Sequence, residues 1–126
     1  MQVDISDFKL FDAEMKFMDI VWENEPLRSR ELVKLCAERL GWKQSTTFTV
    51  LKKLSNRGIV KNEATVVTSL VGRDQVQRYE SEAIVKKSFG GSLPSFIAAF
   101  MSGKRLSDEE ADELKKLVDS YREGGK

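Results

Sequence analysis

The sequence predicts a mainly α-helical protein with one small β-hairpin, and three observations support this fold class. Apolar residues recur at three- and four-residue spacing in several separate segments, as expected for amphipathic helices. Two short β-branched runs, residues 59–61 and 66–71, flank a short turn and are typical of a hairpin. Hydrophobic residues make up 40% of the chain and charged residues 33%, which indicates a globular protein rich in helix. The 126 residues suffice for one ordinary domain, or for a small domain with an oligomerising appendage.

Two helices are predicted in the first third of the chain. The first covers residues 12–23, where apolar residues form one face, and Pro26 separates it from the next helix. The second covers residues 29–40, with Ser29 as a possible N-cap and Gly41 at its C-terminal end.

A third helix is predicted from the N-cap Ser45 to the position before Gly58. At about 100° per residue, its apolar side chains fall on one side and most of its polar side chains on the other. The inward set is Thr47, Val50, Leu51 and Leu54, and the outward set is Ser45, Thr49, Lys52 and Asn56, flanked by Phe48 and Lys53. Three helices followed by a hairpin predict a winged helix-turn-helix.

This third helix lies in a basic block of the sequence. Residues 39–62 contain no acidic residue, although the formal net charge of the chain is only +1. The basic residues of the block are Arg39, Lys43, Lys52, Lys53, Arg57 and Lys61. Cations for phosphates, short polar groups for base edges and an apolar inner face are what a helix needs to lie in a major groove. A solvated amphipathic helix, or a surface that docks an acidic protein, is the alternative explanation of the same charges.

The second half of the chain has a different pattern. Helices are predicted over residues 73–88, over Leu93–Met101 and after a capping box that starts at Ser107. Helices this short have little within one chain to bury their apolar stripes against, so we expect a homodimer. The expected dimer interface comprises Phe96, Ile97, Phe100, Leu114, Val118 and Tyr121. We therefore predict a winged helix-turn-helix domain over residues 1–71 and a helical dimerisation region over residues 72–126.

Composition argues against several classes of function. The chain has no histidine and a single cysteine, Cys36, so it cannot form a histidine-based catalytic triad or a zinc site of histidines and cysteines. Cys36 follows an apolar helical pattern and is expected to be buried. The acidic residues 108–113 follow the Ser107 capping box and complement the helix dipole, so they do not indicate catalysis. We predict no enzymatic activity, no cofactor and no metal site.

The apolar runs are short, and the longest covers residues 96–101. A run of this length cannot span a bilayer or form the core of a signal peptide. We therefore expect a cytoplasmic protein that does not bind membranes directly.

Fragments spread over residues 8–121 carry a family resemblance. They are Asp12-Ala13-Glu14 with Val21-Trp22, Glu31-Leu32-Val33, Trp42, the run from Thr46 to Leu54 with Gly58, Ser69-Leu70-Val71, Phe89-Gly90-Gly91-Ser92, and Leu106-Ser107. In this order they resemble the penicillinase and copper-responsive repressor family (BlaI, MecI and CopY type). The resemblance implies an N-terminal winged helix-turn-helix that binds operator DNA and a C-terminal helical region that dimerises the protein.

Together with the helical projection, the resemblance indicates how DNA would be bound. The third helix would enter the major groove of a double-stranded, pseudo-palindromic operator, and the dimer would set the spacing of two half-sites. The expected DNA-binding residues are Ser45, Thr46, Phe48, Thr49, Lys52, Lys53 and Arg57. Thr46, Phe48 and Thr49 are expected near base edges, and the three cations at phosphates. The role of Thr46 depends mainly on the resemblance.

The chain departs from the family's pattern in several places. Its hairpin is short and has no basic residue at the tip, which argues against a DNA contact by the wing. Phe48 stands where members often carry a long side chain, and an aromatic ring there suits a thymine methyl group. The cysteine-rich metal motif of the copper-responsive branch is absent.

Two further expectations concern the inducing signal. In the lactam-responsive branch, a membrane sensor protease leads to cleavage of the repressor at an Asn-Phe bond, and the aligned bond here is Ala99–Phe100. A sensor protease is therefore a possible partner, although Phe100 is better explained as a core or dimer anchor. A small-molecule-responsive winged-helix repressor of another family is the closest alternative function.

Overall fold

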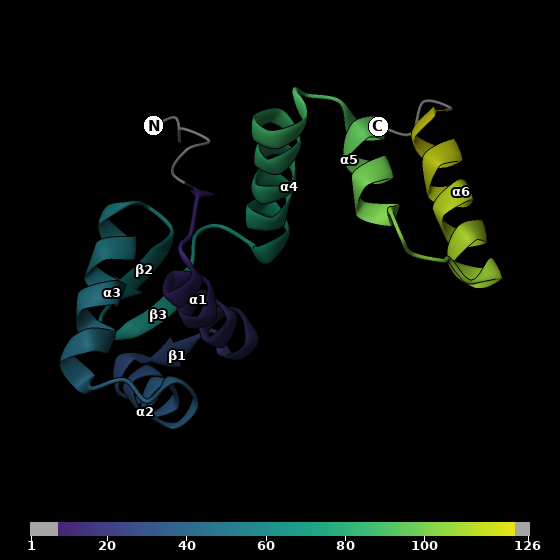
Figure 1. The fold of residues 1–126 in the computed structure, drawn as a ribbon. Helices are drawn as coiled ribbons and strands as arrows, with labels where there is room; N and C mark the ends of the chain where they lie inside the picture. Colours follow the sequence, from purple (N-terminus) through teal and green to yellow (C-terminus); the bar gives the residue numbers. More distant parts are fainter. Residues whose placement is uncertain (1–7, 123–126) are drawn as a thin grey trace. The chain divides into compact units, whose positions relative to one another are not determined.

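The computed structural model describes residues 8–122 and divides into two compact units, the first ending at Ile84 and the second beginning at Val85 (Figure 1). Residues 1–7 and 123–126 of the two predicted domains lie outside the described residues. Across residues 8–122 the fold consists of six α-helices and one small antiparallel sheet. The predicted fold class, mainly helical with a small hairpin, is confirmed.

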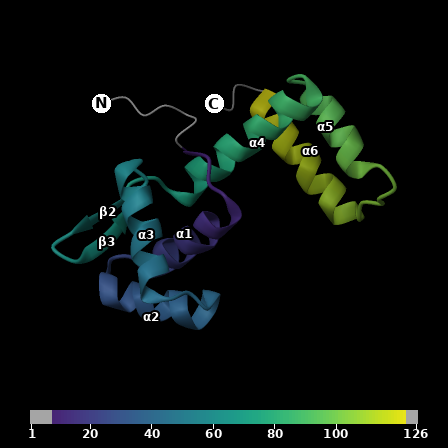
Figure 2. The same cartoon turned by 60° about the vertical axis from the view of Figure 1, so that its left-hand side comes forward.

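The first unit contains a three-helix core and the sheet. Its elements are α1 (Asp12–Asn24), β1 (Leu27–Arg28), α2 (Ser29–Leu40), α3 (Gln44–Asn56), β2 (Val60–Glu63), β3 (Val66–Ser69) and the start of α4 (Arg73–Phe89). The strand order is β1-β3-β2, with Leu27 opposite Val67 and Val60 opposite Ser69. The hairpin β2-β3 is the wing of a winged helix-turn-helix, and the views in Figures 1 and 2 show it beside α3.

Apolar side chains from α1, α2, α3, the start of α4 and the sheet form one core. Its fully buried members include Phe17, Met18, Val21, Leu32, Leu54, Ile59, Val60, Val67 and Val76. The ring of Trp42 stacks on Phe17 with 6.1 Å between centroids and thereby covers the turn between α2 and α3. The indole N–H of Trp22 donates to the carbonyl of Val71 at 2.9 Å, so the end of the wing is fastened to α1.

The strand β1 was not predicted, and its presence explains why Ser29 is not an N-cap. Arg28 pairs with Val66 in the sheet, and the N–H of Ser29 donates to the carbonyl of Thr65 at 2.8 Å. The extended chain therefore turns into α2 directly after Arg28, and Ser29 is already helical. The Glu31 carboxylate accepts from the N–H of Arg28 at 3.0 Å and satisfies one of the free donors at the start of α2.

The predicted N-cap of the third helix was also wrong. α3 begins at Gln44 with Lys43 as its N-cap, because the N–H of Thr47 donates to the carbonyl of Lys43. Ser45 is therefore the second helical residue. The predicted ends are confirmed: Gly41 and Gly58 follow α2 and α3 with positive φ angles of 70° and 78°, a conformation that favours glycine.

The second unit consists of the end of α4 together with α5 (Leu93–Met101) and α6 (Asp108–Arg122). The hydroxyl of Ser92 accepts from the N–H of Ser95 at 3.1 Å, and the hydroxyl of Ser107 accepts from the N–H of Glu110 at the same distance. These bonds cap α5 and α6, and the second is the predicted start of the last helix. α5 and α6 lie side by side and antiparallel in both views (Figures 1 and 2).

The predicted boundary at residue 71 separates two functions, DNA binding and dimerisation, and it stays a prediction. The compact units divide thirteen residues later, because Val76 of α4 is fully buried in the core of the first unit. Among residues 8–122, none of the helices combines the length and apolarity needed to cross a membrane.

Candidate nucleic-acid interface

The inner face of α3 anchors this helix to the winged-helix core. Thr47, Leu51 and Leu54 are buried, as the helical projection predicted, and Val50 is half-buried. The Thr47 hydroxyl faces Cys36 of α2. Burial raises the pKa of the Cys36 thiol, and the neighbouring Thr47 hydroxyl opposes this rise in part. Cys36 is therefore a neutral packing residue beneath the helix, as expected.

The outer face of α3 presents hydroxyls, one aromatic ring and two lysines to solvent. Ser45, Thr46, Phe48, Thr49, Lys52 and Lys53 are all exposed, and only Arg57 of the expected DNA-binding set is half-buried. The Phe48 side chain is 39% exposed, so its ring is available to a partner. The hydroxyl of Thr49 donates to the carbonyl of Ser45 at 2.9 Å, which fixes its rotamer and leaves its oxygen able to accept.

The C-terminal turn of α3 lies beside an acidic side chain of α1, a partner that the linear sequence did not indicate. The carboxylate of Glu14, from α1, lies 3.3 Å from the Nζ of Lys53 and 3.4 Å from an Nη of Arg57. The guanidinium of Arg57 also donates to the carbonyl of Lys9. The basic block is therefore free of acid in sequence but not in space, and Lys53 and Arg57 are held differently from Lys52.

The wing presents little charge at its tip. Ala64 and Thr65 form the turn between β2 and β3, and Lys61 of β2 pairs with Glu63 at 3.3 Å. The hydroxyl of Thr65 lies 3.4 Å from the guanidinium of Arg28, and this contact is exposed. The tip itself thus offers hydroxyl and backbone groups to a partner, and Arg28 is the cation beside it.

The helices α5 and α6 are described over their whole lengths, and neither contains a buried side chain. Among the expected interface residues, Phe100 is 57% and Tyr121 is 69% exposed, and Phe96, Ile97 and Leu114 are half-buried. Aromatic contacts link Phe89, Phe96 and Phe100 along one side of α5. Neighbouring apolar side chains that stay exposed in this way are typical of an interaction surface.

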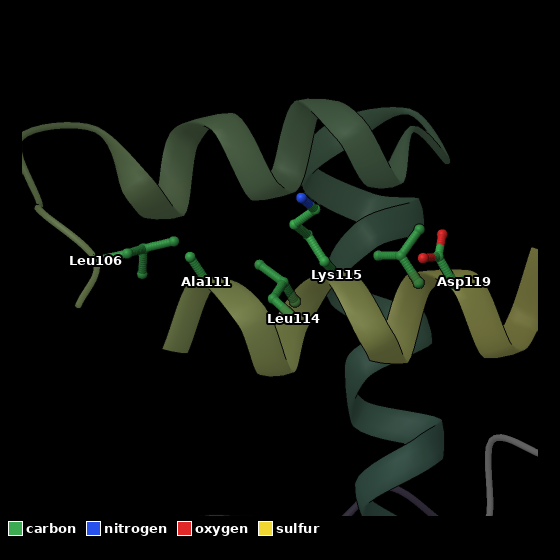
Figure 3. Close-up of a pocket in the computed structure, with 6 residues that line it drawn as sticks. Leu106, Ala111, Leu114, Lys115 and Asp119 are labelled. Atoms are coloured by element: carbon green, nitrogen blue, oxygen red, sulfur yellow. The ribbon is translucent and has the colours of Figure 1, made fainter. Parts of the chain in front are cut away.

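An apolar groove runs along α6 within the second unit. It is lined by Leu106, Ala111, Leu114, Lys115, Val118 and Asp119 and has a volume of about 340 Å³. Figure 3 shows the side chains of Leu114 and Lys115 pointing into the space next to the neighbouring helix. The expected dimer residues Leu114 and Val118 thus line one continuous depression.

Comparison with known proteins gives one family. The family model described as penicillinase repressor matches residues 10–120. The penicillinase repressor of Bacillus licheniformis is 22% identical over 118 residues, which cover 90% of this chain and 92% of that protein. The methicillin resistance regulatory protein MecI of Staphylococcus aureus (strain Mu50 / ATCC 700699) is 22% identical over 120 residues, which cover 92% of this chain and 98% of that protein.

Proposed function

Since the chain belongs to the penicillinase repressor family, we propose that it is a homodimeric transcriptional repressor that binds a pseudo-palindromic operator in double-stranded DNA. The observation that carries this proposal is the outer face of α3. Short hydroxyls, one ring and two lysines are exposed there, while the opposite face of the same helix is locked into the core. A helix of this kind fits the width of a major groove.

The proposed contacts divide by chemistry. Thr46, Phe48 and Thr49 meet base edges, because their side chains are short or apolar and exposed. Lys52 and Lys53 neutralise phosphates, which fix the register of the helix but carry no sequence information. Ser45, in the first turn of α3, donates to a phosphate or a base edge beside them.

The proposed dimer forms through the second unit. The exposed apolar residues of α5 and α6 have no cover within one chain, and a second copy offers the same surface in return. Two recognition helices of a dimer bind half-sites about 10 base pairs, or a multiple of this, apart. The dimer thereby converts two weak contacts into one tight contact.

The proposal is tested by selecting genomic fragments that the purified chain binds and measuring their affinity against salt. We expect a two-fold related motif, and an affinity that falls by orders of magnitude between about 50 and 200 mM salt. Lys52→Ala should reduce the slope of log affinity against log salt by about 0.9 for all sequences alike, as one phosphate contact is lost. A weak salt dependence and the absence of any selected motif would point to a protein-docking module instead.

Cleavage of the chain between Ala99 and Phe100 is one proposed way to release the repressor from DNA. The Ala99–Phe100 bond lies inside α5, and a protease that cuts it needs the helix to open locally. Glycines with positive φ, Gly91 and Gly103, flank the helix and favour such opening. Mass spectrometry of the chain from induced cells distinguishes the mechanisms. Fragments ending at Ala99 support a sensor protease, whereas an intact chain leaves a ligand as the inducer.

A further inference from the structure

Among residues 8–122, Glu14 is the acidic residue that pairs with both Lys53 and Arg57 at the end of α3. Its side chain is 6% exposed and accepts a backbone hydrogen bond from Phe11 at 3.0 Å. Both of its oxygens face cations, with Lys53 beside Oε2 and Arg57 beside Oε1. A carboxylate this deeply buried is stable only while it is paired, because the loss of its partners would leave an uncompensated charge.

The two cations are held unequally. The Arg57 side chain is 24% exposed and donates both to Glu14 and to the carbonyl of Lys9, so it is fixed between α1 and the segment before it. The Lys53 side chain is 58% exposed, and its ammonium lies 5.9 Å from the centre of the exposed Phe11 ring. The exposed Lys53 can leave Glu14 more easily than the buried arginine can, but its departure removes one of the two cations that the buried carboxylate faces.

We infer that Glu14 is a positioning residue for DNA binding, which retains Arg57 in the fold and competes with the phosphate backbone for Lys53. This inference rests on the proposed function. A phosphate that takes Lys53 must draw it away from Glu14. The Glu14 carboxylate stays nearby, so the net positive charge brought to the phosphate is smaller and fewer of the counterions condensed on the DNA are released. Glu14 would thereby limit the sequence-independent part of the affinity and leave the base contacts of α3 to decide where the repressor binds.

The substitution Glu14→Gln tests this inference in the full-length chain. The amide oxygen can still accept from the N–H of Phe11, since glutamine serves in this helix position as glutamate does. The phosphate backbone then has no anionic competitor for Lys53. We expect the salt slope on unrelated duplex DNA to steepen by up to about 0.9 and the affinity at low salt to rise several-fold.

Glu31→Gln is the matched control. Glu31 occupies the same position in α2 that Glu14 occupies in α1, and it accepts from the N–H of Arg28 at 3.0 Å. Among the described residues it has no ion pair with α3, and its substitution changes the net charge equally. A slope that steepens for Glu14→Gln and stays constant for Glu31→Gln supports the inference. Equal shifts in both variants, or no shift in either, overturn it.

A second measurement keeps Glu14 in place and does not depend on how the glutamine variant folds. Lys52 has no ion pair among residues 8–122, so Lys52→Met should lower the slope by a full phosphate contact, and Lys53→Met by clearly less. Equal reductions would show that Glu14 does not compete for Lys53. A wild-type chain without salt-dependent duplex binding would instead contradict the proposed function itself.

Discussion

At the scale of single residues, Phe48 is the side chain with the greatest expected influence on base preference. Its ring lies on the outer face of α3, exposed between hydroxyl-bearing residues, where it contributes little to the core. Phe48→Ala should therefore change the preferred base pairs and cost on the order of 1 to 3 kcal/mol at the best site. Site selection with both proteins measures this. Leu70→Ala, which removes another exposed apolar side chain away from α3, should leave the selected motif unchanged.

The outer and inner faces of α3 could be predicted from the sequence because helical periodicity alone decides them. Thr47, Leu51 and Leu54 are buried as their spacing required. The partnership of Glu14 with Arg57 could not be predicted, because it joins residues 43 positions apart through the packing of α1 on the end of α3. In the sequence, Glu14 has the pattern of an ordinary helix-capping residue, which it also is.

At the scale of elements, the wing turn is strained. Ala64 and Thr65 have φ angles of +52° and +64°, and neither is a glycine. This left-handed conformation costs roughly 1 to 2 kcal/mol per residue with a side chain, and a β-branched residue adopts it least easily. Replacing the pair by Ala64→Asn with Thr65→Gly, which suits a two-residue hairpin turn, should raise the free energy of unfolding by about 1 kcal/mol. Urea denaturation measures this, and Ala64→Val should lower the same quantity.

Besides the buried Val76, one arginine connects the start of α4 to α1. A guanidinium nitrogen of Arg73 lies 3.0 Å from Asp19 and 3.9 Å from Glu23, and the group sits 5.2 Å from the centre of the Trp22 ring. Arg73→Ala removes an ion pair and a cation–π contact together, so the free energy of unfolding should fall by about 1 kcal/mol. Arg78→Ala in the same helix removes only an exposed pair with Glu82 and should change it by less than about 0.5 kcal/mol. Equal losses would mean that Arg73 does not fasten α4.

The helices and the wing could be predicted as elements, but their exact beginnings could not. The strand β1 has two residues, too few for any pattern to indicate it. An N-cap at Ser29 would have made residue 30 the first helical residue. The pairing of β1 with β3 instead ends the extended chain at Arg28, so α2 starts at Ser29. The start of a helix thus depended here on a contact with residues far along the chain.

At the scale of the whole molecule, apolar spacing indicated which faces of α5 and α6 seek a partner, but not how much one chain covers by itself. The structure adds that both helices lack buried side chains and that Phe100, Val118 and Tyr121 are largely exposed. The partner that covers them cannot be predicted from periodicity, because any apolar surface of matching shape would serve. Homodimerisation therefore stays a prediction that solution measurements must decide.

Charge placed in the groove of α6 should separate the proposed dimer. Leu114→Asp with Val118→Asp introduces two carboxylates into the depression that the apolar side chains line, and burying them against a second copy would cost several kcal/mol. The double variant should sediment as a monomer and lose most of its operator affinity, because each half-site is then bound alone. Lys116→Asp changes the net charge by the same two units on the opposite face of α6 and should remain dimeric. If the double variant sediments as a dimer, the interface lies outside this groove, and the aromatic side of α5 becomes the surface to test next.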